Sequence, residues 1–257
     1  MVVVRLKGGL GNQLFQYYFG KYIEYNGAEV LYDIVEFSQK NLRKLEIQDL
    51  LLEQKIKSIF RFNDLFVFSN YSLINCKVFE TFNESIKEEE NYYFNGYFQE
   101  LAFWQGFRTK VIGHFWAHFN KEDLTGYAGV HVRRGDYISA KNKDSHGFVG
   151  LHYYEKALRI LPEDLRVVVF SDDIEWCRET DCFSSALFVE NLFVEEITDF
   201  QEFLLLSSCS WIVTANSSYS WWAAYLSDAK VITPSCWFLN EHTESKRPNA
   251  LREWIQI

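Results

Sequence analysis

Residues 2–33 read VVVRLKGGLGNQLFQYYFGKYIEYNGAEVLYD. The apolar run at 2–6 predicts a buried strand, because a short continuous run bounded by turn residues suits a parallel sheet. The glycine-rich stretch at 8–11 breaks this run, and apolar residues then recur at helical spacing over 12–25. A second strand is expected at 29–33. This succession of strand, glycine loop, helix and strand predicts an α/β layer.

The same alternation continues along the chain. Further strands are expected at 92–98, 128–132, 166–170, 186–190, 211–215 and 230–233. Helices are expected at 45–60, 100–120, 152–161, 199–208 and 216–226, and the charged stretch 85–91 is expected to be a loop. Such alternation predicts parallel sheets covered on both faces. We therefore expect an α/β protein of the GT-B-like kind, with two Rossmann-like domains, residues 1–125 and 126–257, facing each other across a cleft.

Composition limits the function. The 257 residues are 48% hydrophobic and 24% charged, as in globular proteins, and the formal net charge of −9 disfavours non-specific nucleic-acid binding. Five cysteines without a CxxC pair predict reduced thiols. Neither a signal peptide nor an apolar run of about 18 residues is evident, so a cytoplasmic location is expected. The aromatic residues, 18% of the chain, serve as core volume or as platforms for a sugar.

Polar residues gather where the predicted strands end, which is where open parallel sheets bind ligands. The first such segment is GGLGNQ at 8–13. Its glycines would let the backbone approach an oxyanion at a helix N-terminus. The alternative is an ordinary tight turn with Asn12 as the helix cap. Leu14 stands at the third glycine position of a dinucleotide fingerprint, which disfavours an NAD(P)-dependent oxidoreductase, and no P-loop follows.

The segment HVRRGD at 131–136 follows a predicted strand. His131 and Arg133 share one face of that strand, because strand side chains alternate. The guanidinium of Arg133 offers donors in a fixed fork, which suits the oxygens of a phosphate. The alternative for Arg133 and Arg134 is a structural ion pair with an aspartate at the strand end.

Two more segments complete the predicted edge. Asp172 and Asp173 could hold a divalent metal, accept hydrogen bonds from the edge of guanine, or cap the following helix. In the turn that starts at Asn216, Ser217 and Ser218 could form an anion site with the free N–H groups of a helix start, or Asn216 or Ser217 could simply cap that helix. Together the segments predict a bound nucleotide diphosphate and favour a nucleotide-sugar transferase.

Four blocks in the same order span almost the whole chain: GGLGNQLFQY at 8–17, HVRRGDY at 131–137, FSDD at 170–173 and NSSYSWWAAYL at 216–226. They resemble the α-1,2-fucosyltransferases of glycosyltransferase family 11. The resemblance implies a GT-B fold, GDP-β-L-fucose as the donor, the 2-hydroxyl of a terminal galactose as the acceptor, and inversion at the fucose anomeric carbon.

The resemblance also implies site residues. Arg133 would bind the donor diphosphate, with His131 near the guanine and a carboxylate of the 172–173 turn on the guanine edge. The 217–218 turn would hold phosphates, and Asn12 would lie near the diphosphate.

Breaking the fucosyl–phosphate bond places negative charge on GDP, which Arg133 and helix ends can stabilise without a metal. No cofactor or metal is therefore expected. Asp136 is the candidate base for the attacking hydroxyl, or else a clamp on a neighbouring arginine. Acceptor contacts are expected from 93–104 and from His152 and Tyr153. The acceptor could be a lipid-linked precursor, with peripheral association at the inner membrane. The alternative function is an inactive, lectin-like protein that binds glycan or GDP.

Overall fold

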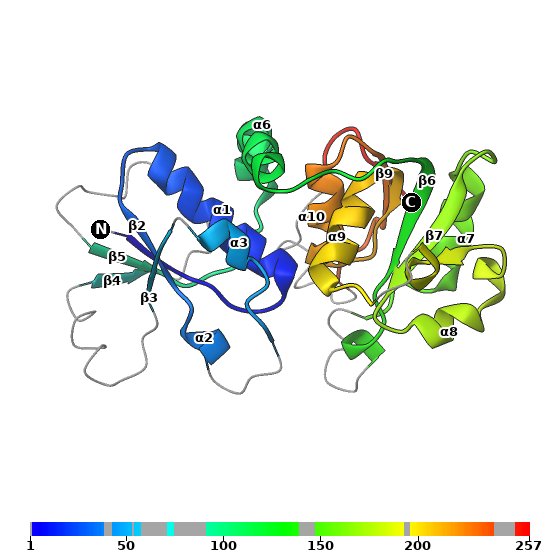
Figure 1. Cartoon of the computed structure of the whole chain (residues 1–257), viewed down its shortest axis with the longest axis horizontal. Coiled ribbons are helices and arrows are strands. Elements are labelled where there is room, and N and C mark those ends of the chain that lie inside the picture. The colour runs from blue at the N-terminus through cyan, green and yellow to red at the C-terminus, as the bar shows by residue number, and fades with distance from the viewer. Residues whose placement is uncertain are drawn as a thin grey trace. The chain divides into compact units, whose positions relative to one another are not determined.

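The computed structural model describes residues 2–38, 43–52, 54–57, 71–74, 91–138, 147–192, 196–238 and 250–257. The chain divides into two compact units, Met1–Val111 and Ile112–Ile257. In the described part of each unit, every strand pair is parallel. Each unit is thus an α/β layer, as the sequence predicts (Figure 1).

The first unit contains a sheet whose described strands follow the order β3-β2-β1-β5-β4. Its elements are β1 (Val2–Arg5), α1 (Leu10–Tyr25), β2 (Val30–Asp33), α2 (Val35–Ser38), α3 (Gln48–Leu51), β3 (Lys55–Lys57), β4 (Tyr71–Ile74), β5 (Asn91–Phe94) and the start of α6 (Leu101–His118).

Helix α1 packs closely on this sheet. A Cβ on Gly20 would overlap the ring of Tyr32, so the glycine lets the helix reach β2. The helix begins at Leu10 and has Gly9 as its N-cap. Asn12 therefore lies in the first turn, and the interpretation of Asn12 as the helix cap is wrong.

The prediction of a helix at 45–60 is also wrong. Of the residues described in this stretch, only Gln48–Leu51 is helical, and Lys55–Lys57 forms β3 beside β2. Pairing with a neighbouring strand has overridden the apolar spacing of this stretch. Residues 58–60, and residues 85–90 of the expected charged loop, lie outside the described residues.

The second unit contains a sheet in the order β11-β10-β9-β6-β7-β8. Its elements are β6 (Leu124–Val132), the 3-10 helix η2 (Asp136–Ile138), α7 (Leu151–Ile160), β7 (Arg166–Ser171), α8 (Ile174–Arg178), η3 (Asp181–Phe183), β8 (Leu187–Phe188), η4 (Val189–Leu192), α9 (Asp199–Ser208), β9 (Cys209–Val213), α10 (Ser218–Leu226), β10 (Lys230–Thr233) and β11 (Ile255–Gln256). The strands and helices expected here are confirmed, although several ends shift, and β11 is an additional strand.

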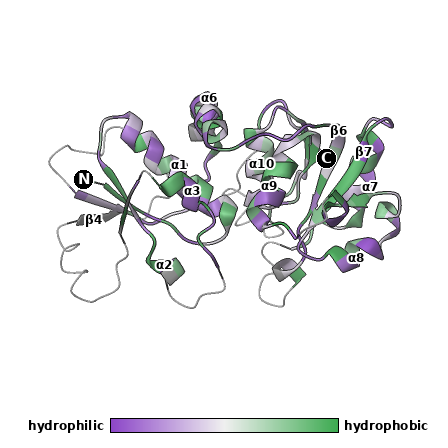
Figure 2. Cartoon of the chain, in the orientation of Figure 1, coloured by the Kyte–Doolittle hydropathy of each residue, from purple (hydrophilic) through white to green (hydrophobic). Residues whose placement is uncertain are grey.

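Strand β6 separates two helical layers. Val130 and Val132 face a cluster that includes residues of α7 and α8. A Cβ on Gly129 would instead meet Leu206 of α9, so alternate residues face the other layer. Figure 2 shows β7 as largely hydrophobic, whereas the outer helix α8 carries hydrophilic residues. The side chain of His131 therefore lies on the face that α9 and α10 cover.

The boundary between the units falls inside α6, earlier than the expected position at 125. The reason is that the end of α6 packs within the second unit. The rings of Phe115 and Phe203 lie 6.1 Å apart, and Trp116 Nε1 donates a hydrogen bond to the Leu226 carbonyl at 2.8 Å. Among the described residues, no helix has the length and apolar character needed to cross a membrane.

Candidate functional site

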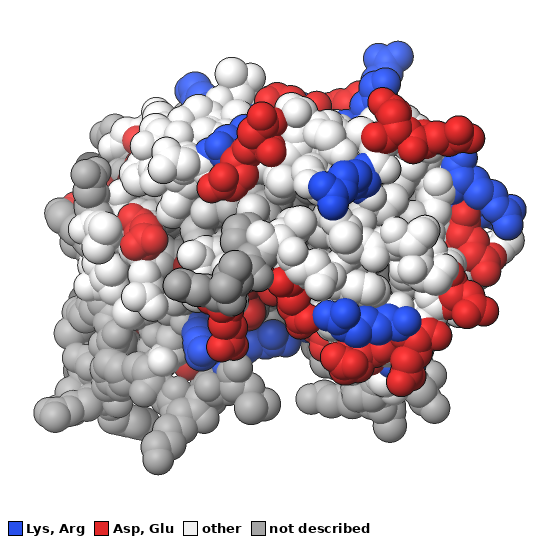
Figure 3. Space-filling view, turned by 45° about the vertical axis from the view of Figure 1, so that its right-hand side comes forward, with Lys and Arg blue, Asp and Glu red and all other residues white. Residues whose placement is uncertain are grey.

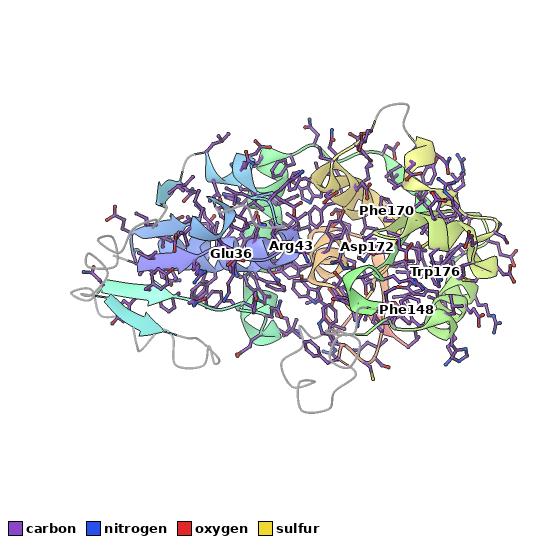
Figure 4. All side chains as sticks on the ribbon, turned by 90° about the horizontal axis from the view of Figure 1, so that it is seen from below. Glu36, Arg43, Phe148, Phe170, Asp172 and Trp176 are labelled. Atoms are coloured by element: carbon purple, nitrogen blue, oxygen red, sulfur yellow. The ribbon has the colours of Figure 1, made fainter. Side chains whose placement is uncertain are left out.

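Three loops meet at the carboxyl edge of the second sheet. They follow β9, β6 and β7, which are neighbours in the sheet order. Figure 4 shows Phe170 on β7, Asp172 just beyond the end of that strand, and Trp176 on α8. The edge thus brings together the residues that the sequence predicts for nucleotide binding in this unit.

The carboxylate of Asp172 holds the loop after β6. Its Oδ1 accepts a hydrogen bond from the backbone N–H of Arg134 at 2.9 Å, and its Oδ2 accepts one from Gly135 at 3.1 Å. The same Oδ2 lies 3.0 Å from Arg133 Nη1. Successive backbone N–H groups form an anion-binding nest, and here a carboxylate of the same chain occupies it. A Cβ on Gly135 would lie 2.6 Å from Asp172 Oδ2, so only glycine leaves room for this arrangement.

The neighbouring carboxylate has a different partner. Asp173 Oδ2 lies 2.6 Å from Arg134 Nη1, and the Arg134 guanidinium lies 4.3 Å from the centre of the Trp176 ring. The Trp176 ring in turn meets Phe148 edge-on at 5.3 Å. Asp173 is the N-cap residue of α8, but its side chain makes no cap hydrogen bond, so the capping interpretation is wrong for this side chain. The predicted alternative of an ion pair with an aspartate at the strand end is confirmed for both arginines, Arg133 with Asp172 and Arg134 with Asp173.

His131 is held as a neutral imidazole. Burial, followed by the nearby charge of Arg133, lowers its pKa to about 3. Its ring stacks on Tyr219 of α10 with a centroid distance of 5.0 Å. Within the described residues, the buried Nδ1 has no hydrogen-bond partner. A neutral imidazole offers one donor and one acceptor, so His131 retains hydrogen-bonding capacity for a ligand.

The start of α10 supplies the positive end of a helix. Ser217 is the N-cap residue, and its side chain accepts a hydrogen bond from the backbone N–H of Tyr219 at 3.4 Å. The capping interpretation of Ser217 is thus confirmed, and Ser218 begins the helix. The Asn216 amide donates to the carbonyls of Gly147 and Trp237 at 3.1 and 3.0 Å. Asn216 therefore ties two other loops to this turn.

Asn12 belongs to the first unit, where α1 organises the edge of the other sheet. Its Oδ1 accepts a hydrogen bond from Gln99 Nε2 at 2.9 Å. Two glutamines of the same helix have similar roles. Gln13 donates to the carbonyls of Gly8 and Lys44, and the Gln16 Oε1 accepts from the backbone N–H of Lys7 at 2.8 Å. The polar residues of GGLGNQLFQ thus hold the loops around the glycine turn, a role that was not predicted from the sequence.

Asp136 and Tyr153 are two further residues that were expected to contact the substrates. Asp136 begins η2, but its side chain lies outside the described part of the chain. Tyr153 is buried, and its hydroxyl donates to the carbonyls of Thr214 and Ile232 at 2.7 and 3.2 Å. Tyr153 therefore holds the ends of β9 and β10. Its contact with an acceptor stays a prediction.

Possible metal ligands and the distribution of surface charge are two further features of the molecule. Among the described residues, no group of three His, Cys, Asp or Glu side chains could hold a metal ion. Figure 3 shows positive and negative side chains interspersed on the drawn face, without a large area of one sign.

Some residues of the site were not predicted as such. Tyr219 stacks on His131, Tyr154 donates a hydrogen bond to the His131 carbonyl at 3.1 Å, and Trp176 stacks on Arg134. Tyr219 lies within the NSSYSWW block, but nothing in the sequence shows that its ring meets a histidine about ninety residues earlier. Contacts of this kind depend on which strands become neighbours.

Comparison with known proteins identifies the family. The model of glycosyl transferase family 11 matches residues 1–257. The chain belongs to glycosyl transferase family 11. The predicted resemblance to this family is thereby confirmed, and the chain is a glycosyltransferase.

Family 11 relatives cover the chain to different extents. An alpha-1,2-colitosyltransferase of Escherichia coli is 31% identical, over 100% of this chain and 99% of the relative. The O-antigen biosynthesis glycosyltransferase WbnK of Escherichia coli is 28% identical, over 98% of this chain and 99% of the relative. The galactoside alpha-(1,2)-fucosyltransferase 1 of Lagothrix lagotricha is 31% identical, over 51% of this chain and 38% of the relative.

A solved structure agrees on the fold. The heptosyltransferase WaaC of Escherichia coli with ADP matches 99% of this chain and 92% of its own, with a TM-score of 0.50 and 9% sequence identity. This glycosyltransferase is of the GT-B class, so the GT-B-like α/β fold predicted from the sequence is confirmed.

Proposed function

We propose that this family 11 enzyme transfers L-fucose from GDP-β-L-fucose to the 2-hydroxyl of a terminal galactose, with inversion at the fucose anomeric carbon. The observation that carries the proposal is the sheet edge where Arg133 and the start of α10 belong to adjacent strand–loop segments. A guanidinium and a helix N-terminus suit a departing diphosphate. Two of the relatives also carry α-1,2 transfer in their names, one of fucose and one of colitose.

In the proposed reaction, the galactose 2-hydroxyl attacks the fucose anomeric carbon, while the bond from that carbon to the β-phosphate oxygen breaks. Negative charge then develops on GDP, and Arg133 and the α10 N-terminus stabilise it electrostatically. Ser217 caps the N-terminus of α10 and Ser218 is its first residue, so both contribute to this stabilisation through the helix end. The hydroxyl proton passes to a base, for which we propose Asp136.

We further propose that Asp173 recognises the guanine. The N1–H and the exocyclic amino group of guanine are both donors, and a carboxylate accepts from both. Asp172 already accepts two backbone N–H groups and faces Arg133, whereas the described contacts of Asp173 engage only its Oδ2. The neutral His131 would lie beside the same base.

A second donor is favoured by one observation, the 31% identity to a colitosyltransferase over the whole chain. Colitose is fucose without its 3-hydroxyl. A site that hydrogen-bonds this hydroxyl discriminates strongly against a sugar that lacks it, because buried polar groups lose their partner. The two donors therefore need to be compared on the same enzyme.

Mass spectrometry of a galactoside panel tests the function. We expect incubation with GDP-fucose to add one deoxyhexose to a terminal galactose and to release GDP in equal amount, and NMR to show an α-1,2 linkage. Faster transfer from GDP-colitose would reassign the donor. GDP binding without transfer from either donor would support the inactive, glycan-binding alternative. We propose a cytoplasmic location, peripheral at the inner membrane where the acceptor is lipid-linked.

We expect transfer to proceed without a divalent metal. Arg133 and the α10 N-terminus supply positive potential to the diphosphate, and a cation beside them would be repelled. Asp172 and Asp173 each already face an arginine, at 3.0 and 2.6 Å. Enzyme stripped of metal and assayed in excess EDTA should retain most of its rate. A rate that collapses and returns with Mn²⁺ or Mg²⁺ would assign these aspartates to a metal.

A further inference from the structure

The loop at 95–99, directly after β5, is unusually well fixed for a surface loop. Four of its residues form hydrogen bonds with other segments. Asn95 Oδ1 accepts one from Lys7 Nζ at 2.7 Å, and the Gly96 carbonyl accepts one from Gln16 Nε2 at 3.1 Å. The Phe98 carbonyl accepts one from Trp104 Nε1 at 2.8 Å, and Gln99 Nε2 donates one to Asn12 Oδ1 at 2.9 Å. The loop lies at the carboxyl edge of the first sheet, where α/β proteins bind ligands.

Backbone strain marks the middle of this loop. Phe98 has a φ of 52°, and it is the only non-glycine residue with a positive φ among those the structure describes. Its ring is buried and stacks on Phe19 with a centroid distance of 3.9 Å. A bulky residue persists in this conformation only where its surroundings hold it there, and such strain clusters at functional sites.

Tyr97 directly precedes the strained residue Phe98 and lies at the surface. Tyr97 is 47% exposed, although Asn95 and Phe98 on either side of it are held by a hydrogen bond and by ring stacking. Lys7 Nζ lies 4.7 Å from the centre of the Tyr97 ring and also fixes the Asn95 amide. Partial burial, followed by the charge of Glu36, raises the pKa of the Tyr97 hydroxyl, which therefore stays protonated as a donor.

These groups match the chemistry of a sugar. A pyranose presents a face of C–H groups, which packs on an aromatic ring, and a rim of hydroxyls, which need donors and acceptors. Tyr97 offers the ring. The Lys7 ammonium lies over this ring and also donates a hydrogen bond to the Asn95 amide oxygen, so it links the two residues. Tyrosine is common at binding surfaces because its apolar ring and polar hydroxyl serve both needs.

We infer that Tyr97, supported by Lys7 and Asn95, forms the subsite for the galactoside acceptor. The inference rests on the proposed transfer to a galactoside. Tyr97 packs on the C–H face of the acceptor sugar, and the Asn95 amide, whose oxygen is fixed by Lys7, directs its N–H₂ group to a hydroxyl. The strained Phe98 keeps the ring in place before the sugar arrives, so little conformational entropy is lost on binding.

The test compares Tyr97→Ala with Tyr97→Phe. We expect Tyr97→Ala to raise the acceptor KM by about tenfold, as the loss of one aromatic contact does, and to leave the GDP affinity unchanged. Tyr97→Phe keeps the ring but loses the hydroxyl donor, so it should raise the acceptor KM by only about threefold, clearly less than Tyr97→Ala. Tyr25→Ala is the matched control, because Tyr25 is 50% exposed and also has a lysine, Lys110, 5.0 Å from its ring centre, but it ends α1 away from the carboxyl edge.

Direct binding separates this inference from the proposed function. Saturation-transfer NMR with a methyl galactoside, without any donor, should give a signal that Tyr97→Ala removes and Tyr25→Ala keeps. An unchanged acceptor KM and an unchanged NMR signal in folded Tyr97→Ala would overturn the subsite while leaving the transferase assignment intact. A Tyr97-dependent NMR signal in an enzyme that transfers neither sugar would keep the subsite and overturn the proposed function.

Discussion

Arg133→Ala is expected to lower kcat by about 10²–10³ and to weaken GDP binding. Arg133 leaves the end of β6 at the same sheet edge as the start of α10. Its guanidinium is the charged donor that best suits a diphosphate there, and its contact strengthens as negative charge develops on the leaving group. The change should be measured by initial rates with GDP-fucose and by calorimetry with GDP.

Two controls make this result specific. Arg133→Lys keeps the charge but loses the planar fork, so its rate should lie between those of the wild type and Arg133→Ala. Guanosine, which has no phosphate, should bind the wild type and Arg133→Ala almost equally. A folded Arg133→Ala enzyme with a near-wild-type rate would exclude Arg133 from the diphosphate contact.

The architecture of the second unit could be predicted because its sequence is locally consistent. The apolar run at 167–170, for example, predicts a buried strand from its own residues. Helix α9 begins and ends where expected, and Thr198 and Gln201 form a capping box at its start. The two-residue strand β11 gave no periodic pattern, and it exists because Ile255 pairs with Ile232 of β10. Short strands are decided by their neighbours rather than by their own residues.

The candidate site could be predicted only in part. Strand order along the chain shows that the loops after β6, β7 and β9 reach one edge, but it does not show which carboxylate meets which arginine. Asp172 and Asp173 carry the same group on adjacent residues, so metal binding, guanine recognition and capping all remained open. The backbone N–H groups of Arg134 and Gly135 distinguish the two, because they point at Asp172.

Substitutions of the two aspartates are therefore expected to have different effects on nucleotide affinity and on rate. Asp173→Asn should lower the affinity for GDP by about 10- to 100-fold, because one or two charge-assisted hydrogen bonds to guanine are lost. The affinity for UDP should not fall, because uracil presents two acceptor carbonyls that a carboxylate repels and an amide N–H₂ group does not. Asp172→Asn should keep the preference for GDP over UDP and instead lower kcat by about tenfold. An amide has one acceptor oxygen for contacts that now use two, and the ion pair with Arg133 is lost.

Matched variants separate these effects from loss of structure. Gly135→Ala should resemble Asp172→Asn, since its Cβ would approach Asp172 Oδ2 to 2.6 Å and displace the same carboxylate. Arg134→Gln removes the partner of Asp173 but not its carboxylate, so it should keep the preference for GDP even where it lowers the melting temperature. Calorimetry with GDP and UDP, together with initial rates, covers all four variants. If Asp172→Asn rather than Asp173→Asn equalises GDP and UDP binding, the guanine contact belongs to Asp172, and the nest formed by Arg134 and Gly135 must open when the donor binds. If neither change alters the preference, guanine recognition lies outside this turn.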